Sequence, residues 1–222
     1  MAGACRFHGV AEGQLIVVEL FLSAFVTLFV VIDPPGCAPI YAGLTANATP
    51  QARRAMAFRA CAIAGLILLG FALFGAQLLE AMHIELDAFR IAGGIMLFLI
   101  ALEMVFEKRT ERREGRAEKV RADPDYEDVS VFPMAMPMLA GPGAIASILL
   151  LEGSAEGLIG TLVVLGALAA VLALTLLALL AASPLMKLFG SQVEAVITRL
   201  LGVLLAALAA QYVLDGMRNF FG

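Results

Sequence analysis

The stretch 33–39 reads Asp-Pro-Pro-Gly-Cys-Ala-Pro, and its acid, glycine and prolines are the residue types best suited to bind a small solute in this chain. It follows residues 15–32, of which only Glu19 is charged. Proline removes a backbone donor, clashes with the preceding turn and disfavours helical angles for its predecessor, so this stretch must break a helix. Because an unsatisfied backbone group in lipid costs several kcal/mol, we expect the break to line protein or a wet cavity.

A second break is predicted at 140–143, Ala-Gly-Pro-Gly, where Pro142 and Gly143 match Pro35 and Gly36 of the first. Two broken helices in corresponding places are typical of transporters, whose solute binds at the interruptions. Proline and glycine kinks also occur in membrane helices without any binding role. The acid at the first break favours the functional interpretation, since acids within membranes are costly. Asp33 also suits a capping role for the half-helix after the break, and the two roles are compatible.

Each break offers two kinds of backbone group to a ligand. The half-helix that begins after Gly36 or Gly143 exposes free N–H groups at the positive end of its dipole, which suits a carboxylate. The preceding half-helices end in free carbonyls, and Asp33 adds a negative charge, so this side suits an ammonium group or a proton. A small zwitterion such as an amino acid would satisfy both sides. The predicted solute- and ion-binding residues are Asp33, Pro35, Gly36, Cys37, Gly141, Pro142, Gly143 and Ser147.

Arg90 and Arg199 each lie in the first turns of a predicted membrane span. Snorkelling of the guanidinium group to the membrane interface is the ordinary role of such residues. The alternative is that one of them pairs with Asp33 or with the carboxylate of a substrate.

The composition sets the class of protein. The chain has 222 residues, of which 61% are hydrophobic and 15% charged, and its mean hydropathy is +0.93. A soluble domain would be about a quarter charged, so we predict a polytopic membrane protein. The net charge of −4 argues against a nucleic-acid partner. Three cysteines without paired spacing and two distant histidines predict neither a metal site nor a cofactor, and the apolar segments lack the groupings that would indicate an enzyme.

The apolar segments predict six spans, and the alternating charges between the third and fourth predict a solvated linker. Helices 1 and 4 contain the breaks, which we place near the membrane midplane. Thr49 and Pro50 predict a helix start, and Pro184 a helix end. The spans are 15–47, 60–79, 88–106, 129–151, 157–186 and 193–214. We therefore expect an external tail at 1–13, a first three-helix repeat at 14–106, a charged cytoplasmic linker at 107–128 and a second three-helix repeat at 129–222.

Basic residues are divided unequally between the two ends of these spans. One end receives three arginines within 53–59, seven basic residues of the linker, Lys187 and Arg199, which together are twelve of the fifteen in the chain. The positive-inside rule then places the linker in the cytoplasm and both termini outside, in the cell inner membrane.

The third and sixth spans share the pattern Arg-x-x-Gly followed by an apolar helix, at 90–93 and 199–202. Together with the two breaks, this match predicts an all-α membrane protein of six transmembrane helices built as two three-helix repeats. Because three is odd, the second repeat must be inverted relative to the first. Two copies of opposite polarity support two equivalent states, one open to each side, which is the basis of alternating access.

Four segments carry a family resemblance: FVVIDPPGCAPI at 29–40, FRIAGG at 89–94, PMLAGPGAI at 137–145 and TRLLG at 198–202. They resemble signatures of the MarC family of bacterial and archaeal six-helix membrane proteins, in order and over nearly the whole chain. The resemblance implies transport of neutral amino acids such as glycine or alanine, driven by an ion gradient. The chain departs from the family at Cys37, where the family motif usually has Asn.

The expected function is therefore secondary transport, with a small-molecule substrate and a coupling ion, H+ or Na+, as partners within the lipid bilayer. The alternative is a non-transporting membrane scaffold whose charged linker recruits a cytoplasmic partner. A transporter should tolerate deletion within 110–120, whereas a scaffold should not. Formation of a homo-oligomer is left open.

Overall fold

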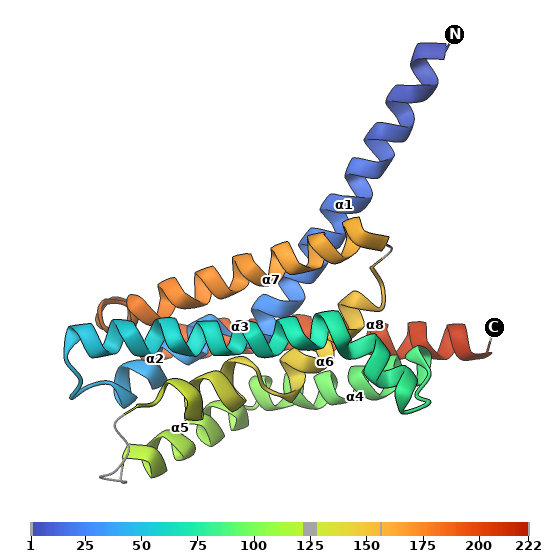
Figure 1. Ribbon diagram of the computed structural model, residues 1–222. Helices are drawn as coiled ribbons and strands as arrows, with labels where there is room; N and C mark the ends of the chain where they lie inside the picture. The colour runs from blue at the N-terminus through green and yellow to red at the C-terminus, as the bar shows by residue number, and fades with distance from the viewer. Residues whose placement is uncertain (1, 122–127, 156, 222) are drawn as a thin grey trace.

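A computed structural model of the protein describes residues 2–121, 128–155 and 157–221. These residues form helices joined by short turns, and no strand occurs among them (Figure 1). The all-α class is confirmed. In chain order the elements are α1 (Ala2–Ile32), α2 (Pro34–Leu44), α3 (Pro50–Ala81), α4 (Leu86–Val105), α5 (Lys108–Arg121), η1 (Ser130–Leu139), α6 (Pro142–Glu152), α7 (Gly157–Leu180) and α8 (Ala182–Phe221).

Within the described residues, five helical stretches are long and apolar enough to cross a membrane, and the bent pair η1 and α6 makes a sixth if it is one span. Large apolar side chains point out of the bundle, among them Leu66, Phe74 and Leu158, which are 69%, 68% and 76% exposed. Lipid tails solvate such a surface, whereas water does not. The chain is a multi-pass membrane protein. The five stretches are Val17–Leu44, Pro50–Ala81, Leu86–Val105, Gly157–Leu180 and Ala195–Phe221.

The first span is broken at Asp33, as the prolines predict. α1 ends at Ile32, Asp33 has a left-handed backbone with φ 59°, and Pro34 is the first residue of α2. Aspartate is among the few residues besides glycine that adopt this conformation readily, and proline at the first helical position loses no needed hydrogen bond. The break is confirmed, and its depth in the membrane stays a prediction.

The N-terminal segment is helical. α1 begins at Ala2, and its first turns project beyond the other helices (Figure 1). Residues 2–13, which we expected to form a tail, therefore continue the helix of the first span. Met1 lies outside the described residues.

The second break separates η1 from α6. The two segments are bent by 51° and α6 starts at Pro142, so the predicted break is confirmed. The segment before it is less regular than expected, because Phe132 and Met136 have extended backbone angles inside η1. Each of these residues precedes a proline, whose ring disfavours helical angles for its predecessor.

The charged linker forms a helix that packs on the bundle. α5 lies against α2, α4 and η1, near the end of the bundle that carries the turn from α2 to α3 (Figure 1). Arg113, Ala117 and Val120 are each at most 7% exposed. The prediction of a solvated linker is wrong for this face, because Arg113 binds an acid inside the bundle. Residues 122–127 of the predicted linker lie outside the described residues.

Two predicted helix boundaries have different outcomes. Thr49 caps α3 by accepting a hydrogen bond from the Ala52 amide at 3.3 Å, and Pro50 is the first helical residue, as expected. α7 ends at Leu180, before the predicted end at Pro184. Pro184 lies instead in the first turn of α8, where the missing N–H of proline costs no helical hydrogen bond.

The helix boundaries of the two halves correspond when the residue number is shifted by 108. α2 and α6 each have 11 residues and begin with Pro34 and Pro142. α3 begins at Pro50, and α7 begins at Gly157, within one residue of the shifted position. Pro142 therefore corresponds to Pro34, and our match of Pro142 with Pro35 is wrong by one position.

The two halves also pack against each other reciprocally. α1 packs on α7 and η1 on α3, while α2 packs on α8 and α6 on α4. The helices α4 and α8 approach each other closely at two glycines. A Cβ atom added at Gly94 would lie 2.9 Å from the carbonyl oxygen of Ala209, and a Cβ atom added at Gly202 would lie 3.1 Å from the carbonyl oxygen of Ala101. Both pairs of positions, 94 with 202 and 101 with 209, are 108 apart. The two close approaches are therefore equivalent, and the two helices run antiparallel.

Candidate solute-binding site

The two breaks meet in the interior of the bundle. A Cβ atom added at Gly143, in the first turn of α6, would lie 3.3 Å from Cγ1 of Val31, in the last turn of α1. Val31, Asp33 and Gly143 are all buried. The end of α1 and the start of α6 therefore belong to one region, which is what two broken helices need in order to share a ligand.

Asp33 is 1% exposed, and donors surround its carboxylate. Oδ1 accepts a hydrogen bond from the Gly36 amide at 3.1 Å, which caps α2. Oδ2 accepts one from Nη1 of Arg113 at 2.8 Å, in an ion pair whose partners are both buried. The hydroxyl of Thr198, in α8, lies 3.5 Å from Oδ1. The capping role is confirmed, and a guanidinium group of the chain itself balances the carboxylate charge.

Arginines of α5 also occupy the carbonyl end of α1. Nη2 of Arg109 donates to the carbonyl oxygen of Val31 at 2.5 Å, and Nη2 of Arg113 lies 3.5 Å from that of Ile32. These carbonyls form the negative end of the α1 dipole, so two cations stabilise it. We expected this side to hold an ammonium group or a proton, and in the structure it holds two guanidinium groups.

Arg109 keeps its charge in these surroundings. The pKa of its guanidinium is lowered to about 10, chiefly by burial and then by the positive charge of Arg113, while the negative charge of Asp33 opposes both effects. At neutral pH the group is still protonated. The Arg109 cation at the end of α1 therefore persists under physiological conditions.

Arg90 and Arg199 have other partners. Arg90 pairs with Asp87 at 3.0 Å within α4, and Arg199 pairs with Glu107 at 2.5 Å. The predicted pairing of one of them with Asp33 is wrong, because an arginine of α5 takes that place. A role of either toward a substrate carboxylate stays a prediction.

A cavity of about 320 Å³ opens beside the second break. The start of α6, apolar side chains of α4 and four arginines of α5 line it. This volume is at the lower end of the range for small-molecule sites, so a solute of amino-acid size fits. Among the described lining residues Glu103 is the only acid, and it pairs with Arg112. The lining includes Val31, Ile100, Glu103, Arg109, Arg112, Arg113, Arg116, Gly141, Pro142, Gly143 and Ala144.

The structure divides the predicted binding residues into three groups. Those of the second break line the cavity. The predicted residues of the first break do not line the cavity. One of them, Asp33, is hydrogen-bonded to Arg113, which does line it. Ser147 is fully buried one turn further along α6, and its hydroxyl has no hydrogen-bond partner among the described residues. The first group is Gly141, Pro142 and Gly143, and the second is Asp33, Pro35, Gly36 and Cys37.

Our sequence reasoning missed the arginines of α5. Positions 109, 113, 117 and 120 recur at helical spacing, and the last two are the apolar residues Ala117 and Val120. Such spacing indicates the buried face of an amphipathic helix. The dense mixed charges between these positions concealed the pattern. For Thr198, which contacts Asp33 from α8, the sequence holds no comparable signal.

Replacing Gly141 with alanine should destabilise the second break. A Cβ atom there would lie 2.4 Å from the carbonyl oxygen of Pro137, so the backbones of η1 and α6 would have to separate. We expect a loss of about 1–3 kcal/mol, seen as a lower thermal unfolding midpoint of the purified protein in detergent. Gly166→Ala is the matched control, since its Cβ would meet nothing within 4 Å. A midpoint for Gly141→Ala equal to that of the control would contradict this account.

The fold and the joined breaks define a multi-pass helical membrane protein with an interrupted first span and a bent fourth segment. The model of the MarC family integral membrane proteins matches residues 18–221, and the chain belongs to this family. The resemblance to the MarC family that the four sequence segments indicated is thereby confirmed.

Relatives of similar length are found in archaea and bacteria. A membrane protein of Archaeoglobus fulgidus is 32% identical over 199 residues, which cover 90% of this chain and 92% of the relative. The membrane protein YvbG of Bacillus subtilis is 32% identical, with 91% and 96% covered. The inner membrane protein YhgN of Escherichia coli strain K12 is 33% identical, with 89% and 95% covered. No solved structure matches the chain.

Proposed function

We propose that this protein is a secondary transporter of small solutes, in particular neutral amino acids, and that the solute binds where the two broken helices meet. The observation that carries the proposal is the contact between the end of α1 and the start of α6, beside a cavity of about 320 Å³. Interrupted helices expose backbone groups that can exchange one partner for another, which an unbroken membrane helix cannot do. The protein acts without cofactor, metal or covalent chemistry.

Alternating access follows from an inverted repeat of two three-helix units. The shift of 108 residues between α2 and α6, the reciprocal packing of the halves and the antiparallel pair α4–α8 support this arrangement. The two units exchange conformations while the solute stays between them. The cavity beside α6 is the access route of one state, and the exchange opens the opposite route.

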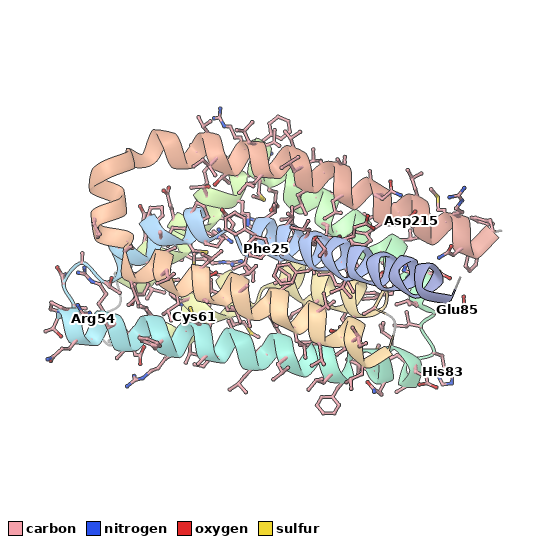
Figure 2. The ribbon with its side chains drawn as sticks, turned by 90° about the horizontal axis from the view of Figure 1, so that it is seen from above. Phe25, Arg54, Cys61, His83, Glu85 and Asp215 are labelled. Carbon is pink, nitrogen blue, oxygen red and sulfur yellow. The ribbon has the colours of Figure 1, made fainter. Side chains whose placement is uncertain are left out.

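The inner membrane is the proposed location, as the name of the relative YhgN says of that protein. Arg54 lies at one end of the bundle, and His83, Glu85 and Asp215 lie at the other (Figure 2). With twelve of the fifteen basic residues assigned to the Arg54 end, the positive-inside rule places this end and α5 in the cytoplasm. Both termini are then outside.

Asp33 is the proposed coupling residue for H+ or Na+. Its carboxylate is buried and shared between the cap of α2 and Arg113. In the proposed cycle the coupling ion replaces Arg113 at this carboxylate, which would otherwise lose its buried counter-ion. Movement of α5 therefore accompanies ion binding.

The alternative function, a scaffold that recruits a cytoplasmic partner, would use α5 as an exposed linker. Burial of Arg113 against Asp33 favours the transport role, since this face of α5 is not available to a partner. The burial of Arg113 also changes what we expect of a deletion within 110–120, which a transporter was expected to tolerate. A deletion that removes Arg113 should abolish the activity of a transporter.

Uptake by purified protein in liposomes tests the proposal. Wild-type protein should accumulate glycine or alanine from a panel of neutral amino acids when an H+ or Na+ gradient is imposed. Asp33→Asn leaves Arg113 without its counter-ion, and its one amide oxygen can replace only one of the two carboxylate oxygens that accept from Gly36 and Arg113, so this variant should lose stability. Where it remains folded, it should reduce ion-driven uptake to background. The variant Asp33→Asn with Arg113→Gln, which leaves no charge unpaired, should behave likewise. Arg59→Gln, at an exposed ion pair, serves as control.

Full uptake by Asp33→Asn would remove Asp33 from the mechanism. Failure of folded wild-type protein to take up any member of the panel under either gradient would refute the assignment to neutral amino acids.

A further inference from the structure

We propose that the cavity beside α6 binds the carboxylate group of the solute, and that arginines of α5 supply the charge that holds it. Gly143 and Ala144, in the first turn of α6, line this cavity together with Arg112 and Arg116 of α5. The inference rests on the proposed transport function for the nature of the solute. Its binding chemistry can be measured without transport.

The charges around the cavity are unbalanced. Four arginines of α5 line it, while Glu103 is the only acid among the described lining residues. Asp33, which does not line the cavity, neutralises Arg113. Four arginines against Glu103 and Asp33 leave two positive charges in excess. Arg116 makes no ion pair with any described residue. Arg112 and Arg116 are exposed, so solvent screens part of this charge, but its sign favours an anionic ligand over a cationic one.

The first break shows how this fold holds a carboxylate. At the start of α2 the carboxylate of Asp33 accepts from a backbone amide and from an arginine of α5. The corresponding residue at the start of α6, 108 positions later, is Gly141, which offers no side chain for the cap. The start of α6 therefore has backbone amides without a side-chain cap, and arginines of α5 line the same cavity, but the chain supplies no carboxylate to bind them. A ligand carboxylate at this place would complete the same set of bonds.

A second polar group in α6 also has no partner. Ser147 lies one turn beyond Gly143 and is 0% exposed, and its hydroxyl is without a hydrogen bond among the described residues. A buried polar group without a partner is costly, and such groups are few in native structures. Ser147 does not line the cavity, but it lies one turn beyond the lining residues Gly143 and Ala144 on the same helix.

A second cavity in the described part of the chain is lined by the opposite charge. This larger cavity of about 590 Å³, near the other end of the bundle between α3, α6 and α7, is lined by Glu80 and Glu152 and by no described lysine or arginine. An acid would be repelled there and attracted to the cavity of α5. The two cavities therefore differ in the sign of the ligand they accept.

The experiment measures binding of three probes to purified protein in detergent by calorimetry: L-alanine, propionate and L-alaninamide. Propionate lacks the amine and alaninamide lacks the carboxylate, so they separate the two ends of the zwitterion. Alanine and propionate should bind to the wild type, and alaninamide should bind at least about tenfold more weakly, since it lacks the charge-assisted hydrogen bonds. The double variant Arg112→Gln with Arg116→Gln should weaken propionate about tenfold or more. Arg59→Gln, which removes an arginine from an exposed ion pair elsewhere, should leave it unchanged.

Three results would overturn the inference: equal binding of alaninamide and alanine, equal binding of propionate by the double variant and the wild type, or no binding of propionate to folded wild-type protein. The outcome is separable from that of the uptake experiment. Alanine uptake that is insensitive to the arginines refutes the carboxylate site and leaves the transport function standing. Arginine-dependent binding of propionate without uptake of any solute supports the site and refutes the transport function.

Discussion

Arg113→Leu is expected to lose about 3–5 kcal/mol of stability, because it leaves the carboxylate of Asp33 buried without its counter-ion. Asp33 and Arg113 are 1% and 6% exposed, and their charged atoms are 2.8 Å apart, so neither can turn to water when the other is removed. The loss should appear as a lower thermal unfolding midpoint in detergent and as reduced recovery of monodisperse protein.

Two further variants separate this effect from a general loss of packing. Arg59→Leu removes one partner of the exposed ion pair with Asp128, whose side chains are 62% and 44% exposed, and should cost less than about 1 kcal/mol. Combining Asp33→Asn with Arg113→Leu should restore most of the stability that Arg113→Leu loses, because no buried charge then lacks a partner. If the double variant is as unstable as Arg113→Leu, the buried charge is not the cause.

Gly94→Leu is expected to separate α4 from α8 and to cost about 3 kcal/mol, at the upper end of the usual range for overpacking. A Cβ atom at Gly94 would lie 2.9 Å from the carbonyl oxygen of Ala209 and 3.0 Å from the amide nitrogen of Val213. Both are backbone atoms of α8, so no side-chain rotation can make room. The thermal unfolding midpoint of the purified protein measures the loss.

The reciprocal packing adds a second expectation to this experiment. Gly202→Leu should cost about as much as Gly94→Leu, since the two positions are equivalent in the antiparallel pair and Gly202 approaches Ala101 in the same way. Gly166→Leu in α7, where a Cβ would meet nothing within 4 Å, is the control and should be neutral or up to about 1 kcal/mol stabilising through helix propensity. A large loss at Gly94 with none at Gly202 would argue against equivalent halves.

Both sets of variants bear on transport as well as on stability. Withdrawal of Arg113 from Asp33 is the step that the proposed mechanism requires, so Asp33→Asn with Arg113→Leu should be stable but inactive. Gly94 and Gly202 allow the close approach of α4 and α8, the two helices that pair across the proposed repeats. A variant that loosens this contact should lose uptake even at temperatures where it remains folded.

The class of protein, the breaks and the helix starts could be predicted from the sequence because each depends on local chemistry. A chain that is 61% hydrophobic can bury so much apolar surface only with the help of lipid. The prolines at 34 and 142 determine where α2 and α6 begin, since the ring removes a donor and restricts the preceding residue. Thr49 caps α3 through an amide three residues away. None of these features requires knowledge of what packs nearby.

The partners of Asp33 and the polar lining of the cavity were decided only by the tertiary structure. Arg113 lies 80 residues from Asp33, in a segment whose mixed charges are typical of a solvated linker, and its neighbours Arg112 and Arg116 on α5 remain exposed. Whether a guanidinium group is solvated or pairs with a buried acid depends on which face of α5 meets the bundle. Which face of α5 meets the bundle depends on all its apolar and ionic contacts with three other elements, α2, α4 and η1. A local sequence pattern does not contain this information.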